Sequence, residues 1–230
     1  MLGKEARDAG RRVIHHAHTK SDEGDCLANG FESGIIWQMK LFDKIHFLDH
    51  ELCPWWFAYT FDNPVRRLLH KPERLVRSYM KEGMTALDIG CGMGHFSIGM
   101  AKLVGDGGRV ISVDLQQKML DKVRKRAERS GVANRISLRL CKQDDIGVSE
   151  PVDFALTFWM AHEVPNQKRM FGQIHLILKD GGRWMLAEPR LHTSAARFKK
   201  EVGVAQEAGF RVVERPAVTM SFAAVLEKAG

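Results

Sequence analysis

The sequence is poor in cysteine and has no long apolar run, and each of these shortages excludes a class of protein. Its 230 residues hold four cysteines, and no two of them stand in Cys-x-x-Cys spacing. That pattern does not indicate a disulfide framework. No apolar run approaches the roughly 20 residues that span a bilayer, and the opening MLGKEARDAGRR lacks the apolar stretch of a secretory signal. We therefore expect a protein without a membrane span, in a reducing cytoplasm. The cysteines are Cys26, Cys53, Cys91 and Cys141.

Positive charge is concentrated in one segment. Residues 118–142 hold nine Lys and Arg against Asp121 and Glu128, an excess equal to the whole net charge of +7. A basic patch can attract nucleic acid or acidic substrates, but it can also be the solvated face of a helix. No aromatic residues interleave these charges, which disfavours stacking on nucleic acid bases. We favour the solvated face and do not expect a nucleic acid partner.

The chain divides into three regions. Residues 1–30 are polar and weakly periodic, so we expect them to be weakly structured. His15, His16 and His18 could join Cys26 around a metal ion, but their irregular spacing is not typical of a metal site. Apolar residues then recur at helical spacing, which predicts a helical extension over residues 31–83 with Pro72 in a first helical turn.

Residues 84–230 alternate between strand and helix patterns. Such alternation predicts an α/β domain with a doubly wound, mostly parallel sheet and helices on both faces. The strands are expected at 85–89, 109–114, 135–140, 152–159, 183–188, 211–214 and 218–227, and the helices at 95–103, 116–129, 167–178 and 194–208.

A glycine-rich turn joins the first of these strands to the first helix. It reads Asp-Ile-Gly-Cys-Gly-Met-Gly from Asp88 to Gly94. Glycine permits positive φ and lets a ligand lie against the backbone, and the helix that follows offers free N–H groups. Such turns at the carboxyl ends of strands bind nucleotides in α/β sheets.

The spacing of the glycines distinguishes between cofactors. A dinucleotide fingerprint would need its third glycine at position 95, where the chain has His95. S-adenosylmethionine has an ammonium and a carboxylate in place of a pyrophosphate, and an acid such as Asp88 suits that group. Asp114 ends the next strand, 20 residues after Gly94, where a carboxylate can accept both ribose hydroxyls. We therefore predict S-adenosylmethionine, with a nicotinamide or flavin cofactor and a turn without a ligand as the alternatives.

Five motifs carry a resemblance to a known family. In chain order they are LDIGCGMG, VISVDLQQKML, CKQDD, VDFALTFWMAHEV and LKDGGRWMLAEP. Residues 84–190 thereby resemble the class I S-adenosylmethionine-dependent methyltransferases of the UbiE-like small-molecule (methyltransferase type 11) branch. The resemblance implies a seven-stranded sheet whose last hairpin is antiparallel, with S-adenosylmethionine as the cofactor and S-adenosylhomocysteine as the product.

The resemblance also implies a set of cofactor contacts. The turn would line the cofactor, Asp114 would hold the ribose, Leu115 would flank the adenine, and the polar turn after the third strand would approach the adenine edge. The family often has Gly-Asp where this chain has Cys141 and Lys142. Phe158 and Trp159 would border the sulfonium and the substrate. The implied cofactor residues are Asp88, Gly90, Cys91, Gly92, Gly94, Asp114, Leu115, Lys142, Gln143, Asp144 and Phe158.

An aromatic segment before the domain is a second candidate for ligand contact. The run Cys-Pro-Trp-Trp-Phe-Ala-Tyr ends at Tyr59. These rings could cover the cofactor and substrate, or they could form the core between the extension and the domain. We predict that Tyr59 contacts the cofactor and that Trp55, Trp56 and Trp159 contact the substrate.

A phenol or an amine must lose a proton before it is methylated, so a base near the substrate helps. His162, which follows the fourth strand, is the best candidate, and Glu163 is the second. His162 could also be a structural histidine in the pocket wall. Glu188, at the end of the fifth strand, could also face the pocket, but we favour a packing or capping role for it.

These patterns predict an enzyme that methylates a small molecule such as a quinol, phenol or amine. The alternatives are a nucleic acid or protein methyltransferase that uses the basic segment, and a cofactor-binding module without catalysis. Family members that methylate exocyclic or side-chain amides usually carry Asn/Asp-Pro-Pro-Tyr/Phe after the fourth strand. The stretch Thr-Phe-Trp-Met-Ala-His stands there instead, which disfavours that subclass.

Overall fold

A computed structural model describes residues 70–229 of the chain. The predicted weakly structured segment, most of the predicted extension, and the aromatic residues Trp55, Trp56 and Tyr59 lie outside the described residues. Their predicted roles therefore stay predictions.

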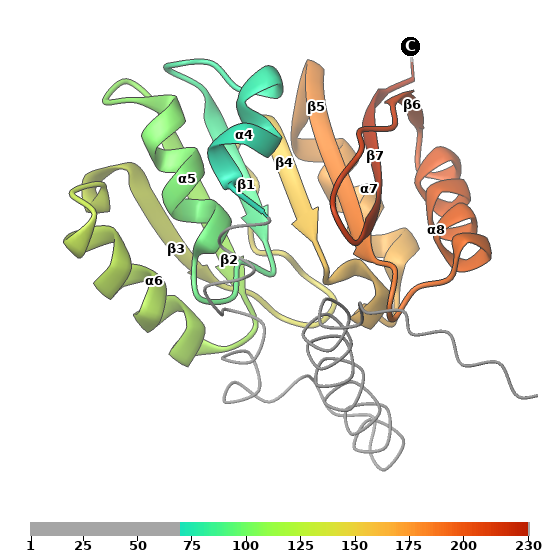
Figure 1. Cartoon of the computed structure of the whole chain (residues 1–230), viewed down its shortest axis with the longest axis horizontal. Helices are drawn as coiled ribbons and strands as arrows, with labels where there is room; N and C mark the ends of the chain where they lie inside the picture. Colours follow the sequence, from blue (N-terminus) through green and yellow to red (C-terminus); the bar gives the residue numbers. More distant parts are fainter. Residues whose placement is uncertain (1–69, 230) are drawn as a thin grey trace, which may run out of the picture. The chain divides into compact units, whose positions relative to one another are not determined.

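The described residues form a seven-stranded sheet with the strand order β3-β2-β1-β4-β5-β7-β6 (Figure 1). All neighbouring strands are parallel except those that pair with β7, which runs antiparallel to both β5 and β6. The predicted sheet and its antiparallel last hairpin are confirmed. The strands are β1 (Thr85–Ile89), β2 (Arg109–Asp114), β3 (Ile136–Leu140), β4 (Val152–Phe158), β5 (Leu178–Pro189), β6 (Phe210–Glu214) and β7 (Ser221–Lys228).

Helices cover both faces of the sheet. Buried side chains of α4 and α5 pack on one face, and those of α7 and α8 pack on the other. Successive residues of a strand point to opposite faces of the sheet. Ala86 therefore packs with the buried side chains of α4 and α5, and Leu87 packs with those of α7 and α8. The helices are α4 (Pro72–Val76), α5 (His95–Val104), α6 (Gln117–Arg129), α7 (Gln167–Ile177) and α8 (Ala195–Glu207), with 3-10 turns η1 (Arg77–Tyr79), η2 (Ala133–Arg135) and η3 (Ala161–Glu163).

The central strands are apolar because both of their faces are covered. Every residue of β4 is buried except Asp153, whose carboxylate accepts a hydrogen bond from the Thr85 backbone N–H at 2.8 Å. On the α7 side, Trp184 of β5 is fully buried and its indole N–H donates to Thr157 Oγ1 at 3.1 Å. This indole fills the layer between the sheet and α7, so it fixes β5 beside β4.

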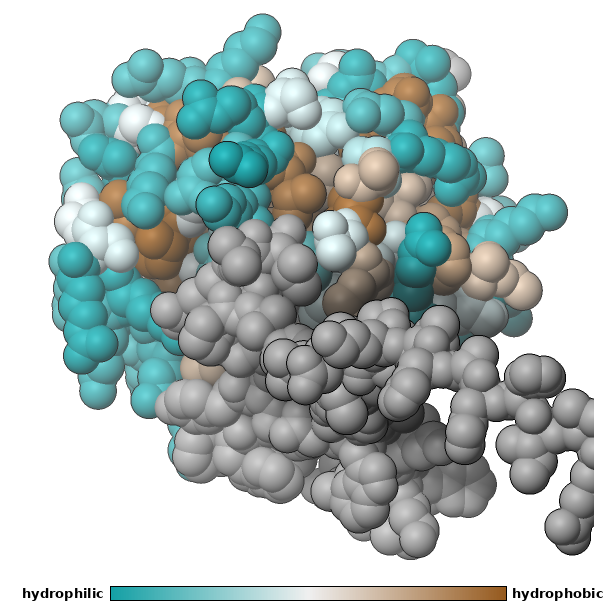
Figure 2. Space-filling view, in the orientation of Figure 1, coloured by the Kyte–Doolittle hydropathy of each residue, from teal (hydrophilic) through white to brown (hydrophobic). Residues whose placement is uncertain are grey.

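Helix α6 is amphipathic, and it sets the charge of one edge of the molecule. Its buried side chains are Met119, Leu120, Val123 and Ala127. Its exposed face carries Lys118, Arg124, Lys125 and Arg129. Figure 2 shows hydrophilic side chains gathered along this edge, at the left of the view. The basic segment predicted from the sequence therefore lies largely on the solvent face of one helix.

Strand β5 is longer than the sequence predicts. A turn was expected at Asp180-Gly181-Gly182, but the strand continues through it from Leu178 to Pro189. Gly181 has φ +73°, and a Cβ on Gly182 would lie 2.8 Å from the Lys179 carbonyl oxygen. The pairing of β4 with β5 shifts register at this point. The two glycines thus form an irregularity inside a strand instead of a turn, and glycine inside a strand commonly marks such a bulge.

Within residues 70–229, no helix is both long enough and apolar enough to cross a membrane. The same residues contain no cluster of three or more His, Cys, Asp or Glu side chains that could hold a metal ion.

Candidate active site

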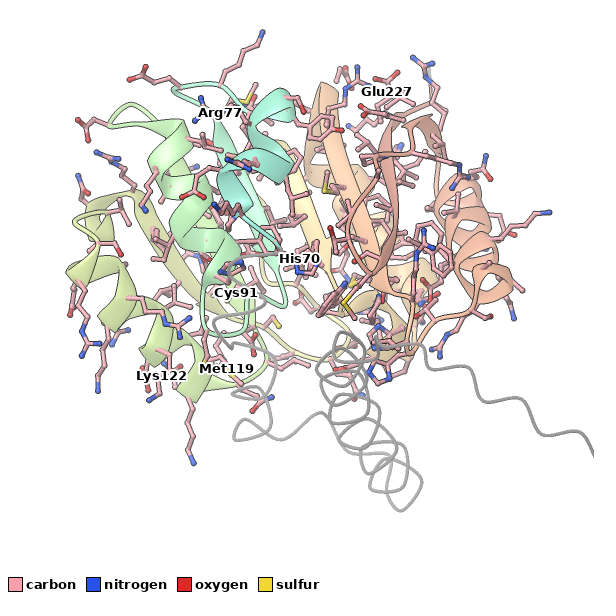
Figure 3. All side chains as sticks on the ribbon, viewed as in Figure 1. His70, Arg77, Cys91, Met119, Lys122 and Glu227 are labelled. Atoms are coloured by element: carbon pink, nitrogen blue, oxygen red, sulfur yellow. The ribbon has the colours of Figure 1, made fainter. Side chains whose placement is uncertain are left out.

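The predicted site residues follow the carboxyl ends of adjacent strands. Strand β1 has β2 on one side and β4 on the other, so the chain changes direction across the sheet between β1 and β4. Ligands bind at such switch points in α/β sheets. These strand ends form the lower edge of the sheet in Figure 1, and Cys91 and His70 lie near that edge in Figure 3.

The three glycines of the turn have different surroundings. Gly90, Gly92 and Gly94 have φ values of +68°, +52° and +82°, which disfavour any side chain. A Cβ on Gly90 would lie 2.8 Å from Met160 Cγ, and one on Gly94 would lie 3.0 Å from Val123 Cγ2. A Cβ on Gly92 would meet no described atom within 4 Å. Gly90 and Gly94 are therefore needed for packing, whereas no described residue packs at the Cβ position of Gly92.

Asp114 ties the end of β2 to this turn. Its Oδ2 accepts a hydrogen bond from the Gly92 N–H at 2.9 Å, and its Oδ1 accepts one from the Gln116 N–H at 2.9 Å. Burial raises the pKa of Asp114, and the hydrogen bonds from Gln116 and Gly92 oppose that shift. Each carboxylate oxygen can accept a second hydrogen bond. This oriented carboxylate, next to a Gly92 position against which no described side chain packs, fits a ribose with two hydroxyls.

Asp88 has a different environment from Asp114. Its side chain is 3 % exposed, and its Oδ2 accepts a hydrogen bond from Ser97 Oγ at 2.6 Å. Ser97 lies in the first turn of α5, so Asp88 joins the end of β1 to that helix. A contact between Asp88 and the cofactor stays a prediction.

Cys91 is a buried part of the turn. Burial, followed by the charges of Asp88 and Asp114, raises the pKa of its thiol well above the ordinary value. The thiol is therefore protonated at neutral pH and packs against Leu120 and Val123 of α6. Cys91 contributes an apolar wall and its backbone to the turn, not a nucleophile.

The residues predicted at the adenine edge lie beside Asp114. The Cys141 N–H donates to the Asp114 carbonyl oxygen at 3.0 Å, which places the turn that holds Lys142 and Gln143 next to the end of β2. Lys142, Gln143 and Asp144 are exposed, and Leu115 is half-buried. The Asp144 carbonyl accepts a hydrogen bond from Gln173 Nε2 of α7 at 2.8 Å. The structure thus brings the ribose and adenine candidates together on one side of the glycine turn.

Phe158 and Trp159 follow β4 with different surroundings. Phe158 is 6 % exposed, and its ring centroid lies 4.4 Å from that of Phe96 in α5, so it packs in the core. Trp159 is half-buried and has φ +62°, a conformation that is uncommon outside glycine. Its indole N–H donates to Ser221 Oγ of β7 at 2.9 Å. Such strain persists where neighbours fix it, often at functional sites.

His162 pairs with Glu188, a contact that the sequence did not predict. The ring Nδ1 of His162 and Oε2 of Glu188 form a short hydrogen bond. Oε1 of Glu188 accepts a second hydrogen bond from the Ala161 N–H at 2.9 Å. Glu188 is fully buried. Both of its oxygens hold the turn that carries the predicted base, and the bond from the Ala161 N–H at the start of η3 agrees with the expected packing or capping role.

Other charged groups surround this pair. Oε1 of Glu163 lies 3.8 Å from His162 Nε2, and Arg197 of α8 donates to the His162 carbonyl at 2.7 Å. The His192 ring lies parallel to the His162 ring, with centroids 6.2 Å apart. Burial lowers the pKa of His162. The hydrogen bond and charge of Glu188 and the charge of Glu163 raise this pKa by more than burial lowers it, so the net shift is upward.

The arrangement of the site agrees with the comparison to known families. Residues 80–216, more than half of the chain, match the family model described as a methyltransferase domain. The chain belongs to this methyltransferase-domain family. The predicted class I S-adenosylmethionine-dependent methyltransferase is thereby confirmed, with S-adenosylmethionine as the cofactor of the family.

Curated relatives of this chain are named for different methyl acceptors. A demethylmenaquinone methyltransferase of Symbiobacterium thermophilum is 29% identical over 117 residues, which cover 50% of this chain and 47% of that protein. A ribosomal protein methyltransferase of Dictyoglomus turgidum is 30% identical over 114 residues, which cover 49% of this chain and 35% of that protein. The matched region therefore spans less than half of either relative.

A solved structure confirms the fold. An S-adenosylmethionine-dependent methyltransferase from Aquifex aeolicus superposes with a TM-score of 0.69 at 22% identity, covering 77% of this chain and all of that one. The N-methyltransferase NodS from Bradyrhizobium japonicum, in complex with S-adenosylhomocysteine, gives 0.61 at 17% identity, covering 74% of this chain and 90% of that one. At these identities the likeness concerns the fold alone.

Proposed function

We propose that this chain transfers a methyl group from S-adenosylmethionine to a small-molecule acceptor. One observation carries the cofactor part: the Asp114 carboxylate is fixed by the N–H of Gly92, beside a position where a Cβ would meet no atom of residues 70–229 within 4 Å. An oriented carboxylate at a strand end is suited to ribose hydroxyls.

The chain offers a consistent set of contacts to the cofactor. The backbone of Gly90 and Gly92 would face it, Asp114 would accept hydrogen bonds from the ribose, and Leu115 with residues 142–144 would border the adenine. When bound, the cofactor supplies an electrophilic methyl group on a sulfonium. The protein then has to orient the acceptor in line with that methyl group and exclude water.

The stretch after β4 supports a small acceptor. Trp159 stands there as a half-buried ring fixed by Ser221, and His162 follows on η3 with its ring fixed by Glu188. An aromatic wall and an oriented base suit a flat organic molecule with an ionisable proton. The curated relatives named demethylmenaquinone methyltransferase point to the same class of acceptor.

A second candidate function is methylation of a nucleic acid or a protein. It is favoured by the basic face of α6, next to which lies a cavity of about 310 Å³ between α6 and β3. Relatives named for a ribosomal protein and a putative rRNA methylase add to it. The lining residues are Arg124, Ala127, Ala133, Ile136 and Leu138. RNA binding whose affinity falls steeply as the salt concentration rises would be its signature.

Calorimetry with S-adenosylhomocysteine tests the cofactor site. We expect Asp114→Asn to weaken binding about tenfold or more, because a hydrogen bond to a charged group contributes roughly 1.5–3 kcal/mol. Asp121→Asn on α6 is the matched control, since Asp121 pairs only with the helix residues Gln117 and Arg124 in the described contacts. Equal affinity in wild type and Asp114→Asn would contradict the proposed ribose contact.

A radiolabel screen with S-adenosylmethionine tests the acceptor class. We expect label in a phenol, quinol or amine and none in bulk RNA or in ribosomal protein. Label in RNA or protein alone, lost when Lys125 and Arg129 are replaced by glutamine, would favour the second candidate. Binding of S-adenosylhomocysteine without any methylated acceptor would point to a module without catalysis.

A further inference from the structure

We propose that Glu188 is a positioning residue that makes His162 a base for a phenolic hydroxyl, so that the acceptor atom is oxygen. The inference rests on the proposed function and narrows it. It starts from the two hydrogen bonds by which Glu188 of β5 holds the turn after β4.

The contacts of Glu188 determine which ring nitrogen of His162 carries the proton. An ionised carboxylate can only accept hydrogen bonds. Nδ1 of His162 must therefore donate to Glu188, and in the neutral ring Nε2 keeps its lone pair. Nε2 lies 3.8 Å from the nearest oxygen of Glu163, which is beyond hydrogen-bond distance. The ring thus holds its basic nitrogen ready for another proton donor.

A buried acid is not needed merely to hold this turn. Gln167 Nε2 of α7 already donates to the Ala161 carbonyl at 2.8 Å, and Arg197 donates to the His162 carbonyl at 2.7 Å. Burying a carboxylate costs several kcal/mol. A neutral glutamine in place of Glu188 could still accept from the Ala161 N–H. The charge of Glu188 is therefore explained by its effect on the imidazole and not by the fold of the turn.

The groups that face His162 come from four elements. They are Glu188 from β5, Glu163 from η3 itself, Arg197 and Glu201 from α8, and His192 from the segment after β5. Two acids lie within 4 Å of the ring nitrogens, whereas Arg197 contacts the backbone carbonyl. The balance favours the protonated ring, in agreement with the raised pKa of His162. The ring is therefore a stronger base than a free histidine.

The strength of this base selects among acceptors. A thiolate or a stabilised carbanion needs little help, and so does an amine once it has lost its ammonium proton. An aliphatic hydroxyl is a much weaker acid than a phenol, so its proton is transferred to an imidazole less readily. A phenol, with a pKa of about 10, lies within a few units of a histidine and gains most from it.

The proposed step is balanced as follows. The O–H bond of the phenol breaks and its proton moves to Nε2 of His162. The oxygen lone pair forms an O–C bond to the methyl carbon, the S–C bond breaks, and sulfur keeps that electron pair. The products are an aryl methyl ether, S-adenosylhomocysteine and a protonated His162, which returns its proton to water.

NMR of the imidazole tests the role of Glu188 without any acceptor. The resonance of His162, one of ten histidines, is assigned by its loss in His162→Gln. We expect Nε2 to be unprotonated in the neutral wild-type ring. In Glu188→Gln the amide would donate to Nδ1, so the proton should move to Nε2 and the pKa of His162 should fall. An unchanged tautomer and pKa in Glu188→Gln would overturn the proposal.

Glu227→Gln is the matched control for this measurement. Glu227 is also a buried acid on a neighbouring strand, but it contacts Arg183 and Arg211 at the opposite end of the sheet (Figure 3). We expect its substitution to leave the tautomer and pKa of His162 unchanged. An equal shift in Glu227→Gln would show that any loss of buried charge has this effect, and it would overturn a specific role for Glu188.

Methyl transfer to two probes tests the accepting atom. With 4-methylcatechol, whose hydroxyls ionise well above neutral pH, we expect kcat/KM of the wild type to rise with pH through the pKa of His162. Glu188→Gln should lower the plateau roughly 100-fold and move the rise to lower pH, while affinity for S-adenosylhomocysteine stays the same. Transfer to benzylamine but not to 4-methylcatechol would overturn the proposal.

Two further outcomes are distinguishable. If Glu188→Gln does not fold, His162→Gln should abolish transfer to 4-methylcatechol with cofactor affinity retained, and full activity in that variant would overturn the role of the base. A wild type that binds no S-adenosylhomocysteine would refute the proposed function itself, whatever the tautomer of His162.

Discussion

At the scale of single residues, Gly92 and Gly131 separate folding from binding. Both have positive φ, +52° and +67°, and a Cβ on either would meet no described atom within 4 Å. We expect Gly92→Ala and Gly131→Ala each to lower the free energy of unfolding by about 1–2 kcal/mol, because alanine is strained at positive φ. Only Gly92→Ala should also weaken S-adenosylhomocysteine binding, since its methyl group would occupy the space proposed for the cofactor.

Urea unfolding and calorimetry check this pair. Gly131 follows α6 and contacts none of the proposed site residues in the described hydrogen bonds, so it reports the backbone cost alone. Equal loss of affinity in both variants would show that the effect comes from general destabilisation. Unchanged affinity in both would remove Gly92 from the cofactor site.

The sequence could point to single residues where one strand end defines them. Asp114 was expected from its place at the end of the second strand, 20 residues after Gly94, and its contact with the Gly92 N–H is compatible with that prediction. The pairing of His162 with Glu188 was not predicted, because it depends on β5 lying beside β4. Phe158 was expected at the sulfonium, but its packing on Phe96 depends on how α5 lies on the sheet. Contacts across strands are thus not readable from one segment.

At the scale of elements, the packing of α4 on α5 reverses the usual effect of replacing a helical glycine by alanine. A Cβ on Gly99 of α5 would lie 2.4 Å from Cβ of Pro72 in α4. Alanine normally stabilises a helix by about 0.5–1 kcal/mol relative to glycine. We expect Gly99→Ala instead to lower the free energy of unfolding by about 1–3 kcal/mol, because the proline ring cannot give way.

Gly203 of α8 is the matched control for Gly99. A Cβ there would meet no described atom within 4 Å, so Gly203→Ala should raise the free energy of unfolding by about 0.5–1 kcal/mol. In thermal and urea unfolding, the free energy of unfolding should fall in Gly99→Ala and rise in Gly203→Ala. Stabilisation by Gly99→Ala would mean that α4 does not pack closely on α5.

The elements themselves were largely predictable from hydrophobic pattern. The buried strands β1, β2 and β4 read as short apolar runs, and α6 reads as an amphipathic helix, so their bounds differ from expectation by about one residue. Strand β5 was misjudged because Gly181 and Gly182 signal a turn in sequence, whereas pairing with β4 carries the strand through them. Tertiary pairing overrode a local signal there.

At the scale of the whole molecule, three buried groups give stability an unusual pH dependence. Burial raises the pKa of Asp114 and that of Glu201, the latter with help from the charge of Glu188. The pKa of His162 is also raised, by Glu188 and Glu163 against the effect of burial. In all three cases the native state holds a proton that the unfolded state releases at lower pH. The free energy of unfolding therefore falls as pH rises through each window.

We expect the ligand-free protein to be more stable near pH 6 than near pH 8. The windows begin at the ordinary pKa values of 3.8 for Asp114, 4.5 for Glu201 and 6.5 for His162, and each extends upward to the raised value. Urea unfolding across this range measures the slope. His162→Asn should flatten it above pH 6.5, and Glu201→Gln should flatten it in the acidic part. A free energy of unfolding that rises towards pH 8 would contradict these assignments.

Cofactor affinity should follow the opposite trend. Ribose hydroxyls donate to the ionised form of Asp114, so S-adenosylhomocysteine binding should weaken as pH falls through the raised pKa of that carboxyl. Burial disfavours the ionised form of Asp114 in the free protein because little water hydrates the carboxylate. For the same reason, hydrogen bonds from the ligand stabilise that charge strongly. Calorimetry from pH 4.5 to pH 8 on wild type and Asp114→Asn checks this coupling. A binding constant with the same pH dependence in both proteins would mean that another group carries it.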